Sequence, residues 1–338
     1  MKAAVLYGAG DVRFEDVADP KAGPGEIVIK TLAAMTCGTD LKVVRRGYHA
    51  KMLRPPCVFG HEAAGEVVEV GEGVVLFKRG DAVVAANSAP CGVCLQCARG
   101  RESLCDDLCF WNGCFADAYV VPARVVAKNV LRLDGVTPQD AAMTEPLACC
   151  VKGVEDASVR ERDRVLVIGA GSIALMLLRL CALKGARVTV AARREASLGV
   201  ATQQGADETV LLSKSDGGLT LASTGSTSSF DAVFDAGGAP ETASLAIRST
   251  ARGGTASLFA GCPAATMVNV DITRVHYDEI RILGSFHHTP ASFRESFRLI
   301  ATKAIEPGLF ITHRGSLPDL PQHLMNPAPG TLKTLVVF

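Results

Sequence analysis

Three short segments carry side chains of the types that hold a catalytic metal ion. They are Cys37-Gly38-Thr39-Asp40, Gly60-His61-Glu62-Ala63-Ala64-Gly65 and Glu145-Pro146-Leu147-Ala148. A thiolate, an imidazole and one or two carboxylates hold Zn²⁺ in an open geometry, with one position left for water or substrate. Each segment alone is weak evidence, because a His beside a Glu is more often an ordinary surface or core pair. The candidate ligands are Cys37, His61, Glu62 and Glu145.

Segment 91–105 has a more specific metal-binding pattern, formed by Cys91, Cys94, Cys97 and Cys105. Three cysteines spaced three residues apart, followed by a fourth, are typical of tetrahedral coordination of zinc by four sulfurs. Such a closed site leaves no room for substrate, so we interpret it as a structural zinc that stabilises a loop with few core residues. The cysteines outside these segments have no comparable spacing and are expected to be small buried side chains.

Several of these residues also have simpler structural interpretations. Thr39 is either a turn residue or, beside a metal, the hydroxyl that passes a substrate proton outward. Glu145 is either a helix cap or a carboxylate that points into a cleft, and Pro146 predicts a helix that begins only after Glu145. Cys37 is expected in a flexible loop, and Asp40 is expected to be a local capping or turn residue.

A dinucleotide-binding motif lies in the second half of the chain. The apolar run 164–168 leads into Gly169-Ala170-Gly171-Ser172-Ile173-Ala174, followed by an apolar helix through residue 183. This is the G-x-G-x-x-A form of the fingerprint in the strand, turn and helix context that it requires. The two glycines permit the turn and the close approach of a pyrophosphate to the helix N-terminus. The predicted cofactor contacts are Gly169, Gly171, Ser172, Ile173 and Ala174.

The next predicted strand, 186–191, ends without the acidic residue that holds the ribose of NAD. It is followed by Arg193 and Arg194, whose guanidinium groups could pair with a 2′-phosphate. NADP(H) is therefore predicted in preference to NAD(H), although the arginines could also simply be solvated. Strands at 230–234 and 255–259 are expected to bring Ala236 and Gly261 to the same cleft. Residues 213–229, rich in Ser, Thr and Gly, are expected to form a flexible surface loop.

Composition narrows the class of protein. The 338 residues suffice for two domains, and 35 basic against 35 acidic residues give zero net charge. This balance argues against a nucleic-acid or membrane-surface partner and favours a small-molecule substrate. Short strands between glycine-rich turns over residues 2–121 predict a barrel-like β domain. The sequence has no signal-peptide or membrane-span pattern, and its cysteines are expected to be reduced thiols or metal ligands in preference to disulfides. These features predict a cytoplasmic protein.

Taken together, these segments resemble the zinc-dependent medium-chain dehydrogenase/reductase family over nearly the whole chain. The metal-ligand motifs are most similar to its sorbitol (polyol) and threonine dehydrogenase branch. The resemblance implies an α/β fold, with a GroES-like β-rich catalytic domain from residues 1–150 and 286–338. It also implies a Rossmann doubly wound parallel-sheet domain over residues 151–285, and a homodimer or homotetramer.

The resemblance also implies roles for individual residues. Cys37 and His61 match the usual catalytic-zinc ligands, and Thr39 matches the proton-relay hydroxyl. Glu62 and Glu145 match positions that share the remaining carboxylate ligation, sometimes exchanging with water.

Residues 284–290 match the segment that passes the nicotinamide and substrate, which makes Phe286 and His287 candidate contacts. His287 stands where polyol enzymes usually have arginine. Lys42 stands where a relay histidine is common, and His49 is a possible substitute.

The predicted reaction is the reversible oxidation of a secondary alcohol to a ketone, with hydride transfer to C4 of the nicotinamide. The alcohol could be a polyol, a sugar derivative, a cyclitol or an amino alcohol. One rival is a zinc-free quinone or enone reductase of the same fold, which would need neither Cys37 nor the four-cysteine loop. Another is a non-catalytic NADP(H)-binding protein, which would be expected to lose its catalytic zinc ligands first.

Overall fold

The computed structural model describes residues 1–48, 52–215, 218–222 and 230–338. The possible relay residue His49 and the end of the expected loop, 223–229, lie outside these ranges. The chain divides into two compact units, of which the first comprises Met1–Ala148 and His288–Phe338. The second unit comprises Cys149–His287. Helix α5 (Thr144–Asp156) begins in the first unit and ends in the second.

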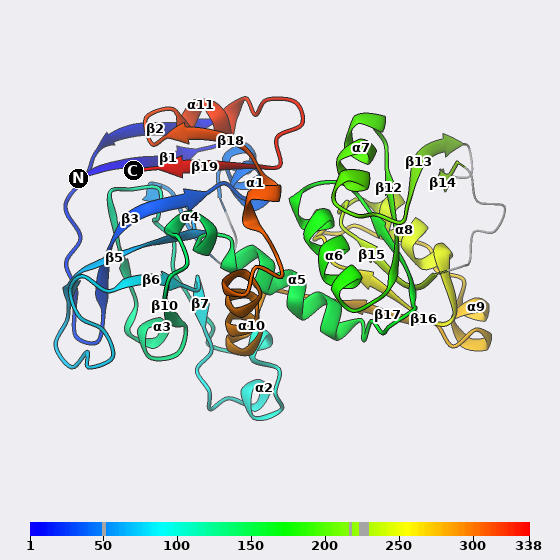
Figure 1. Cartoon of the computed structure of the whole chain (residues 1–338), viewed down its shortest axis with the longest axis horizontal. Coiled ribbons are helices and arrows are strands. Elements are labelled where there is room, and N and C mark those ends of the chain that lie inside the picture. Colours follow the sequence, from blue (N-terminus) through cyan, green and yellow to red (C-terminus); the bar gives the residue numbers. More distant parts are fainter. Residues whose placement is uncertain (49–51, 216–217, 223–229) are drawn as a thin grey trace. The chain divides into compact units, whose positions relative to one another are not determined.

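The first unit is built on a seven-stranded sheet in the order β10-β6-β5-β3-β19-β18, with β9 also paired to β3. Strand β19, from the C-terminus, runs antiparallel to β3 and places Leu335 opposite Met35 (Figure 1). Both ends of the chain therefore contribute to one sheet. Its strands are β3 (Ile27–Met35), β5 (Ala63–Val70), β6 (Ala82–Ala85), β9 (Ala118–Val121), β10 (Val130–Arg132), β18 (Ile311–Ser316) and β19 (Lys333–Val337).

Smaller elements complete the first unit. Strands β1 (Lys2–Gly8), β2 (Asp11–Asp16) and β4 (Cys57–Val58) form a three-stranded sheet, and β7 (Ser88–Ala89) pairs with β8 (Cys109–Phe110). The helices are α1 (Gly38–Arg46), α2 (Leu95–Ala98), α3 (Ala123–Lys128), α4 (Pro138–Ala141), α10 (Pro290–Ala301) and α11 (Leu320–Met325), with 3₁₀ turns η1 (Glu102–Leu104) and η2 (Pro307–Phe310).

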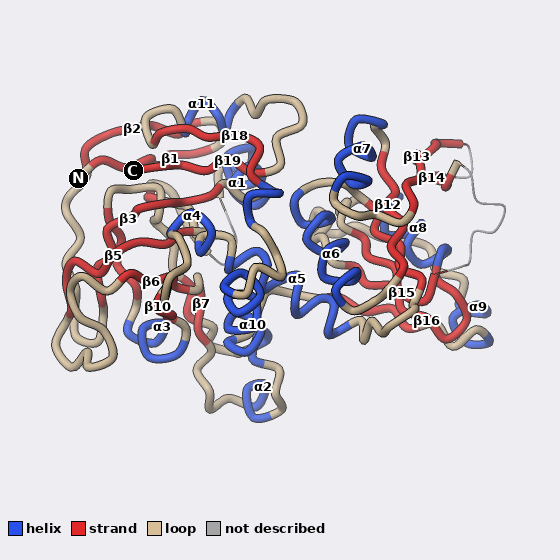
Figure 2. The backbone as a smooth tube through the Cα atoms, viewed as in Figure 1, coloured by secondary structure: helices blue, strands red, loops and turns tan. Residues whose placement is uncertain are grey.

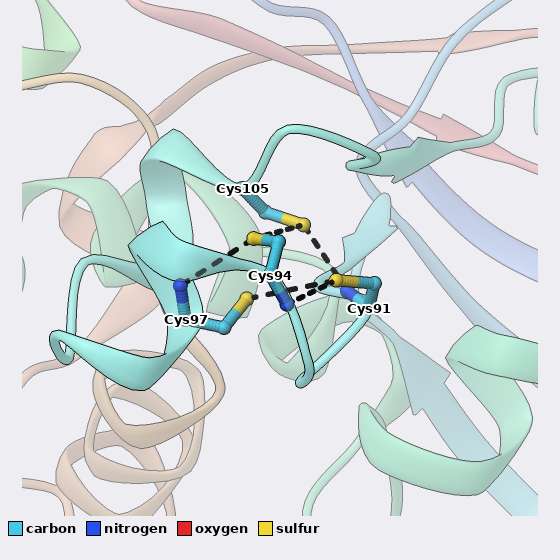
Figure 3. A group of neighbouring side chains, drawn as sticks. All are labelled: Cys91, Cys94, Cys97 and Cys105. Carbon is cyan, nitrogen blue, oxygen red and sulfur yellow. Dashed lines mark hydrogen bonds between the residues drawn. The ribbon is translucent and has the colours of Figure 1, made fainter.

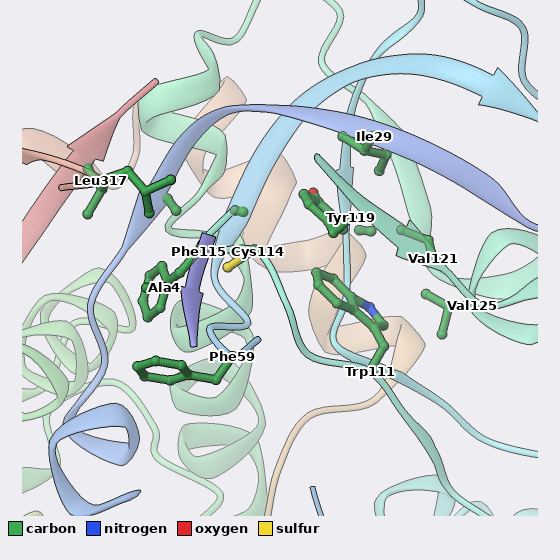
Figure 4. Packing of buried hydrophobic residues seen from close by; sticks show 14 of the residues in the cluster. Ala4, Ile29, Phe59, Trp111, Cys114, Phe115, Tyr119, Val121, Val125 and Leu317 are labelled. Atoms are coloured by element: carbon green, nitrogen blue, oxygen red, sulfur yellow. The ribbon is translucent and has the colours of Figure 1, made fainter. Parts of the chain in front are cut away.

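Aromatic side chains pack among aliphatic ones in the core of the first unit (Figure 4). Phe59 and Phe115 meet edge to face with ring centroids 5.2 Å apart, and Trp111 stacks on Tyr119 at 4.7 Å. Gly60 has φ +93°, and a Cβ atom there would lie 2.6 Å from the Phe115 ring. Only glycine fits this turn, so the aromatic core determines where the chain directly after Gly60 must run.

The second unit is a seven-stranded sheet in the order β14-β13-β12-β11-β15-β16-β17 (Figure 2). Apart from β14, the strands are parallel, and their order is that of a doubly wound dinucleotide-binding sheet. Four consecutive residues of β11 are buried, so both faces of the sheet are covered. The Rossmann prediction is therefore confirmed. The strands are β11 (Arg164–Ile168), β12 (Arg187–Ala192), β13 (Glu208–Ser215), β14 (Gly218–Leu221), β15 (Phe230–Asp235), β16 (Thr250–Leu258) and β17 (Arg281–Gly284).

The helices of the second unit are α6 (Ser172–Leu183), α7 (Glu195–Gln203), α8 (Pro240–Ser249) and α9 (Ile272–Tyr277). Among the described residues, no helix combines the length and the apolar character needed to cross a membrane.

Three local predictions are wrong. Part of the expected loop forms a hairpin, because β13 continues to Ser215 and pairs antiparallel with β14. Cys37 is the N-cap of α1 and not part of a flexible loop. Helix α5 begins at Thr144, so Glu145 lies in its first turn. Pro146 is tolerated there because the first N–H groups of a helix have no partner within the helix.

Candidate metal and cofactor sites

The four cysteines of segment 91–105 converge on one point (Figure 3). Their sulfurs all lie within 4.8 Å of one another, with the Cys91 and Cys97 sulfurs 4.0 Å apart and those of Cys94 and Cys105 3.9 Å apart. Sulfurs bound tetrahedrally at ~2.3 Å from zinc would be separated by about 3.8 Å. The described geometry therefore fits a single tetrahedral zinc ion.

Backbone N–H groups prepare this cluster for a cation. The amides of Val93 and Cys94 donate to the Cys91 sulfur at 3.4 and 3.3 Å, and they lower the pKa of the Cys91 thiol to about 6. Burial raises the pKa of Cys97 to about 12. Four thiolates this close repel one another, so ionisation of all four requires a divalent ion in their midst.

The base of the cysteine loop is held by helix α3. The Lys128 ammonium donates to the carbonyl of Cys91 at 3.1 Å. Arg124 donates to the carbonyl and carboxylate of Asp107 at 2.6 and 2.7 Å. Strand β7 directly precedes the cysteine loop and β8 follows it, and the two strands pair with each other. Protein contacts therefore close the loop at its base, in addition to any metal bound by the sulfurs.

A second cluster joins Cys37, His61 and Glu62, whose ligand atoms lie within 4.8 Å of one another. Cys37 is placed by α1, because its backbone N–H donates to Asp40 Oδ2 at 2.8 Å and its sulfur accepts from the N–H of Thr39 at 3.4 Å. His61 and Glu62 lie between the turn at Gly60 and the start of β5. The structure therefore brings together three of the four predicted catalytic ligands.

His61 is oriented by a buried carboxylate. Its Nδ1 lies 3.4 Å from Asp40 Oδ1, and both side chains are buried. Burial lowers the pKa of the imidazole, but Asp40 and Cys37 more than offset this and hold the pKa well above its usual value. A carboxylate at one ring nitrogen is the partner that commonly orients a histidine whose other nitrogen binds a metal. Asp40, which accepts the backbone N–H of the N-cap Cys37 as predicted for a local capping residue, is therefore also a partner of His61.

Glu62 forms a buried ion pair with Lys333 of β19. Lys333 Nζ lies 2.5 Å from Glu62 Oε2 and 3.1 Å from the carbonyl of Thr36, and the lysine is 1 % exposed. Burial raises the pKa of Glu62, and the ammonium opposes that shift. The other oxygen, Oε1, is buried without a hydrogen-bond partner. A buried oxygen beside a thiol and an imidazole is what a zinc ligand requires, so these residues fit the metal.

Glu145 and Thr39 lie close to this cluster but differ in their contacts. Glu145 is 6 % exposed and lies outside the 4.8 Å group of Cys37, His61 and Glu62. Burial raises the pKa of Glu145 to about 7, with smaller effects from the charges of His61 and Glu62. Thr39 is half-buried in the first turn of α1, two residues after Cys37.

The predicted cofactor residues gather at the carboxyl edge of the parallel sheet in the second unit. Helix α6 begins after β11 with Gly171 as its N-cap and has no side-chain cap, so Ser172, Ile173 and Ala174 present a helix start with uncapped N–H groups. Gly169 has φ +122°, and a Cβ atom there would lie 3.4 Å from the backbone of Ala236.

Apart from the neighbouring residues in the chain, no atom of the described residues lies within 4 Å of a Cβ built on Gly171 or Gly261. This open space above a helix start fits a dinucleotide pyrophosphate. Arg193 and Arg194 are exposed after β12, and Phe286 is 45 % exposed after β17.

Sequence reasoning missed Lys333, which the cluster needs to balance Glu62. The available signal was a single basic residue two positions before the apolar run 335–337. It also missed His288 and Asn87, which are both buried and joined by a 2.8 Å hydrogen bond. Asparagine and histidine have many structural uses, and nothing in their spacing singled out these two.

Comparisons with known proteins match both units. The model of the alcohol dehydrogenase GroES-like domain matches residues 23–131, and that of the zinc-binding dehydrogenase family matches residues 172–302. D-altritol 5-dehydrogenase from Agrobacterium fabrum is 31% identical over 92% of this chain and 91% of its own length.

L-threonine 3-dehydrogenase from Bacillus licheniformis is 34% identical over 75% of this chain and 74% of its own length. A solved structure described as a zinc-binding dehydrogenase from Sinorhizobium meliloti, bound to NADP, has 31% identity and a TM-score of 0.88, covering 100% of this chain and 99% of that one.

The buried ion pair can be tested by replacing Lys333 with Met. The variant leaves the Glu62 carboxylate buried without its cation, and we expect the free energy of unfolding of the metal-loaded protein to fall by about 3 kcal/mol in urea titrations. The double variant Lys333→Met/Glu62→Gln should lose less than the sum of the single variants. Lys30→Met, at an exposed position of β3, is the control. Additive losses would contradict the pairing.

Proposed function

Since the chain belongs to the zinc-binding medium-chain alcohol dehydrogenase family, we propose that it catalyses the reversible oxidation of a secondary alcohol to a ketone with NADP⁺. It is an oxidoreductase of the polyol and threonine dehydrogenase-like branch of that family. The observation that carries the proposal is the buried group of Cys37, His61 and Glu62, with one carboxylate oxygen left unpartnered.

The chain's own residues have separate tasks in this reaction. A zinc ion held by Cys37, His61 and a carboxylate would supply a Lewis acid that lowers the pKa of a substrate hydroxyl. Thr39 would accept the hydroxyl proton and pass it toward solvent, since its side chain is half-buried beside Cys37. Gly169, Gly171 and the start of α6 would hold the cofactor to which the hydride is transferred.

We propose that Glu62 is the resting carboxylate ligand and that Glu145 exchanges with it or with water. One carboxylate oxygen of Glu62 lies in the same 4.8 Å group as the Cys37 sulfur. Lys333 holds Oε2, whereas Oε1 is buried without a hydrogen-bond partner. Glu145 is buried nearby but outside that group. Within the described residues its carboxylate has the His288 imidazole within 4 Å and no lysine or arginine, and the Lys333 charge acts on it from a greater distance. A carboxylate without a fixed cation moves more easily.

The proposed substrates are secondary alcohols with a neighbouring hydroxyl or amino group. This class is supported by the names of the two relatives, which act on D-altritol and L-threonine. His287 and the exposed Phe286 are the proposed substrate contacts. Because His287 replaces the arginine usual in polyol enzymes, assays should include amino alcohols and cyclitols as well as polyols and sugar derivatives.

The preference for NADP(H) over NAD(H) rests on Arg193 and Arg194. Both side chains are exposed directly after β12, where the ribose of the adenosine half would lie. Two guanidinium groups at that position favour a 2′-phosphate, which forms bidentate, charge-assisted hydrogen bonds with arginine. The NADP bound in the Sinorhizobium meliloti protein is consistent with this proposal.

We propose that the enzyme is a homodimer or homotetramer in the cytoplasm, with no nucleic-acid or membrane partner. Strand β17 is the edge of the parallel sheet, and Ile282 on it is 38% exposed. Ile272 and Tyr277 of the neighbouring α9 are 70% and 72% exposed. An open, apolar strand edge can pair with the same edge of a second copy through a two-fold axis. Reduced thiolates at both metal sites fit the cytoplasm.

The zinc mechanism is tested by replacing Cys37 with Ser. We expect turnover to be lost and the zinc content, measured by mass spectrometry, to fall from about two ions per chain to about one. The fold should persist, because the four-cysteine loop is untouched, and the circular dichroism spectrum checks this. Cys57→Ser, at a half-buried position outside both sites, is the control. Near wild-type turnover in the Cys37 variant would favour the zinc-free reductase instead.

The cofactor preference is tested with the double variant Arg193→Ala/Arg194→Ala. Loss of two charge-assisted contacts should raise KM for NADP⁺ by about tenfold or more and leave KM for NAD⁺ unchanged. Arg187→Ala, at the opposite end of β12, controls for loss of charge. An equal rise in KM for both cofactors would show that the arginines do not bind the 2′-phosphate.

The oligomer is tested with Ile282→Lys. A charge on the edge strand should disfavour pairing between copies, so sedimentation equilibrium should show a lower mass for the variant than for the wild type. Leu183→Lys places the same charge at another exposed apolar position of the second unit and should leave the mass unchanged. An unaltered assembly in the Ile282 variant would exclude β17 as the contact.

A further inference from the structure

Two buried polar side chains near Glu145 have no role in the reaction described so far. His288 lies two residues before the first residue of α10, and Asn87 lies between β6 and β7; they are 2% and 1% exposed. The His288 Nε2 atom lies 2.8 Å from Asn87 Oδ1 and 3.9 Å from Glu145 Oε1. One imidazole nitrogen therefore faces both an amide oxygen and the carboxylate that the zinc site is proposed to use.

Packing fixes the distance between His288 and Glu145. Thr289, next to His288, caps α10 through reciprocal hydrogen bonds with Ser292. Further along α10, the Ser296 hydroxyl donates to the carbonyl of Thr144 at 2.7 Å, directly before Glu145. Phe293 is fully buried in a cluster that includes Ala148 of α5. The segment that re-enters the first unit thus holds the beginning of α5 in place.

The chemistry of the contact makes His288 a donor. An amide oxygen can only accept a hydrogen bond, so a ring nitrogen that faces one at 2.8 Å must donate. Because the Asn87 atom facing Nε2 is the acceptor oxygen, the proton belongs on Nε2. The same Nε2 atom lies 3.9 Å from Glu145 Oε1.

We propose that His288 is the positioning residue of the Glu145 carboxylate and that Asn87 holds the imidazole for this task. The inference rests on the proposed function, in which Glu145 shares the carboxylate ligation of zinc. A shift of about 1 Å would bring Glu145 Oε1 within hydrogen-bond distance of Nε2, and an ionised carboxylate is a stronger acceptor than an amide oxygen. The His288 N–H thereby donates to Glu145 when that carboxylate turns away from the metal. When Glu145 returns to the metal, the N–H donates to Asn87 Oδ1 again.

The first test compares two substitutions of His288. Gln places an amide N–H close to the position of Nε2, whereas Leu fills the space without a donor. We expect His288→Leu to lower kcat/KM about tenfold or more, as is typical for partners of metal ligands, and His288→Gln to stay within about threefold of wild type. His276→Leu, at an exposed position of α9, is the control. Equal losses in the Gln and Leu variants would overturn the proposal.

The second test asks whether His288 acts through Glu145. The rate at which Co²⁺ leaves the catalytic site of the cobalt-substituted enzyme is followed in the visible spectrum after addition of a chelator. His288→Leu should change this rate several-fold in the wild-type background and leave it unchanged in the Glu145→Gln background. An equal change in both backgrounds would show a merely structural role and overturn the proposal.

A further variant keeps the test decisive if His288→Leu does not fold. Asn87→Ala leaves the imidazole in place but removes the side chain that holds it. Its effect on the rate of Co²⁺ loss should also disappear in the Glu145→Gln background, and an effect that persists there would overturn the proposal.

Failure of this inference is distinct from failure of the proposed function. The latter would appear as full turnover in the Cys37→Ser enzyme, whereas additive effects of His288 and Glu145 with an inactive Cys37 variant would reject only the positioning role.

Discussion

The buried ion pair between Glu62 and Lys333 is the interaction on which the catalytic site depends. A carboxylate with no exposed surface is costly unless a cation accompanies it, and Lys333 supplies that cation at 2.5 Å. The lysine binds one carboxylate oxygen and leaves the other buried without a hydrogen-bond partner, in a side chain that groups with Cys37 and His61. One residue thus both stabilises the charge of Glu62 and selects the oxygen that remains for a metal.

This pair also explains why the two ends of the chain must meet. Lys333 begins β19, which pairs with β3, and the hydroxyl of Thr36 accepts the backbone N–H of Thr334 at 3.0 Å. The strand that leads into Cys37 is therefore the strand that the C-terminus pairs with. The pairing of β19 with β3 therefore also brings Lys333 to the buried carboxylate of Glu62.

The two metal sites are built on opposite principles. The four cysteines lie within fifteen residues, and local N–H groups from Val93 and Cys94 already support the thiolates. The catalytic group instead takes its ligands from the start of α1 and from the turn before β5, with Lys333 from the far end of the chain. A closed local site suits a structural role, whereas ligands from separate elements leave room for a substrate.

The sequence by itself determined what depends on neighbours along the chain. The spacing of four cysteines, the glycine turn after a buried strand, and the ligand types at Cys37 and His61 are local patterns with few alternative uses. They were enough for the Rossmann sheet, the cysteine loop and the candidate ligands. Some local patterns still misled, since Pro146 suggested a helix boundary that the free first turn of α5 does not require.

Only the tertiary structure decided which distant groups share the buried space. It paired Glu62 with Lys333, placed Asp40 against His61 and left Glu145 beside His288 and Asn87. It also turned part of the expected surface loop into the β13–β14 hairpin. These outcomes depend on burial and on charge compensation between residues far apart in the chain. A local sequence pattern therefore cannot predict which distant side chain will pair with a buried charge.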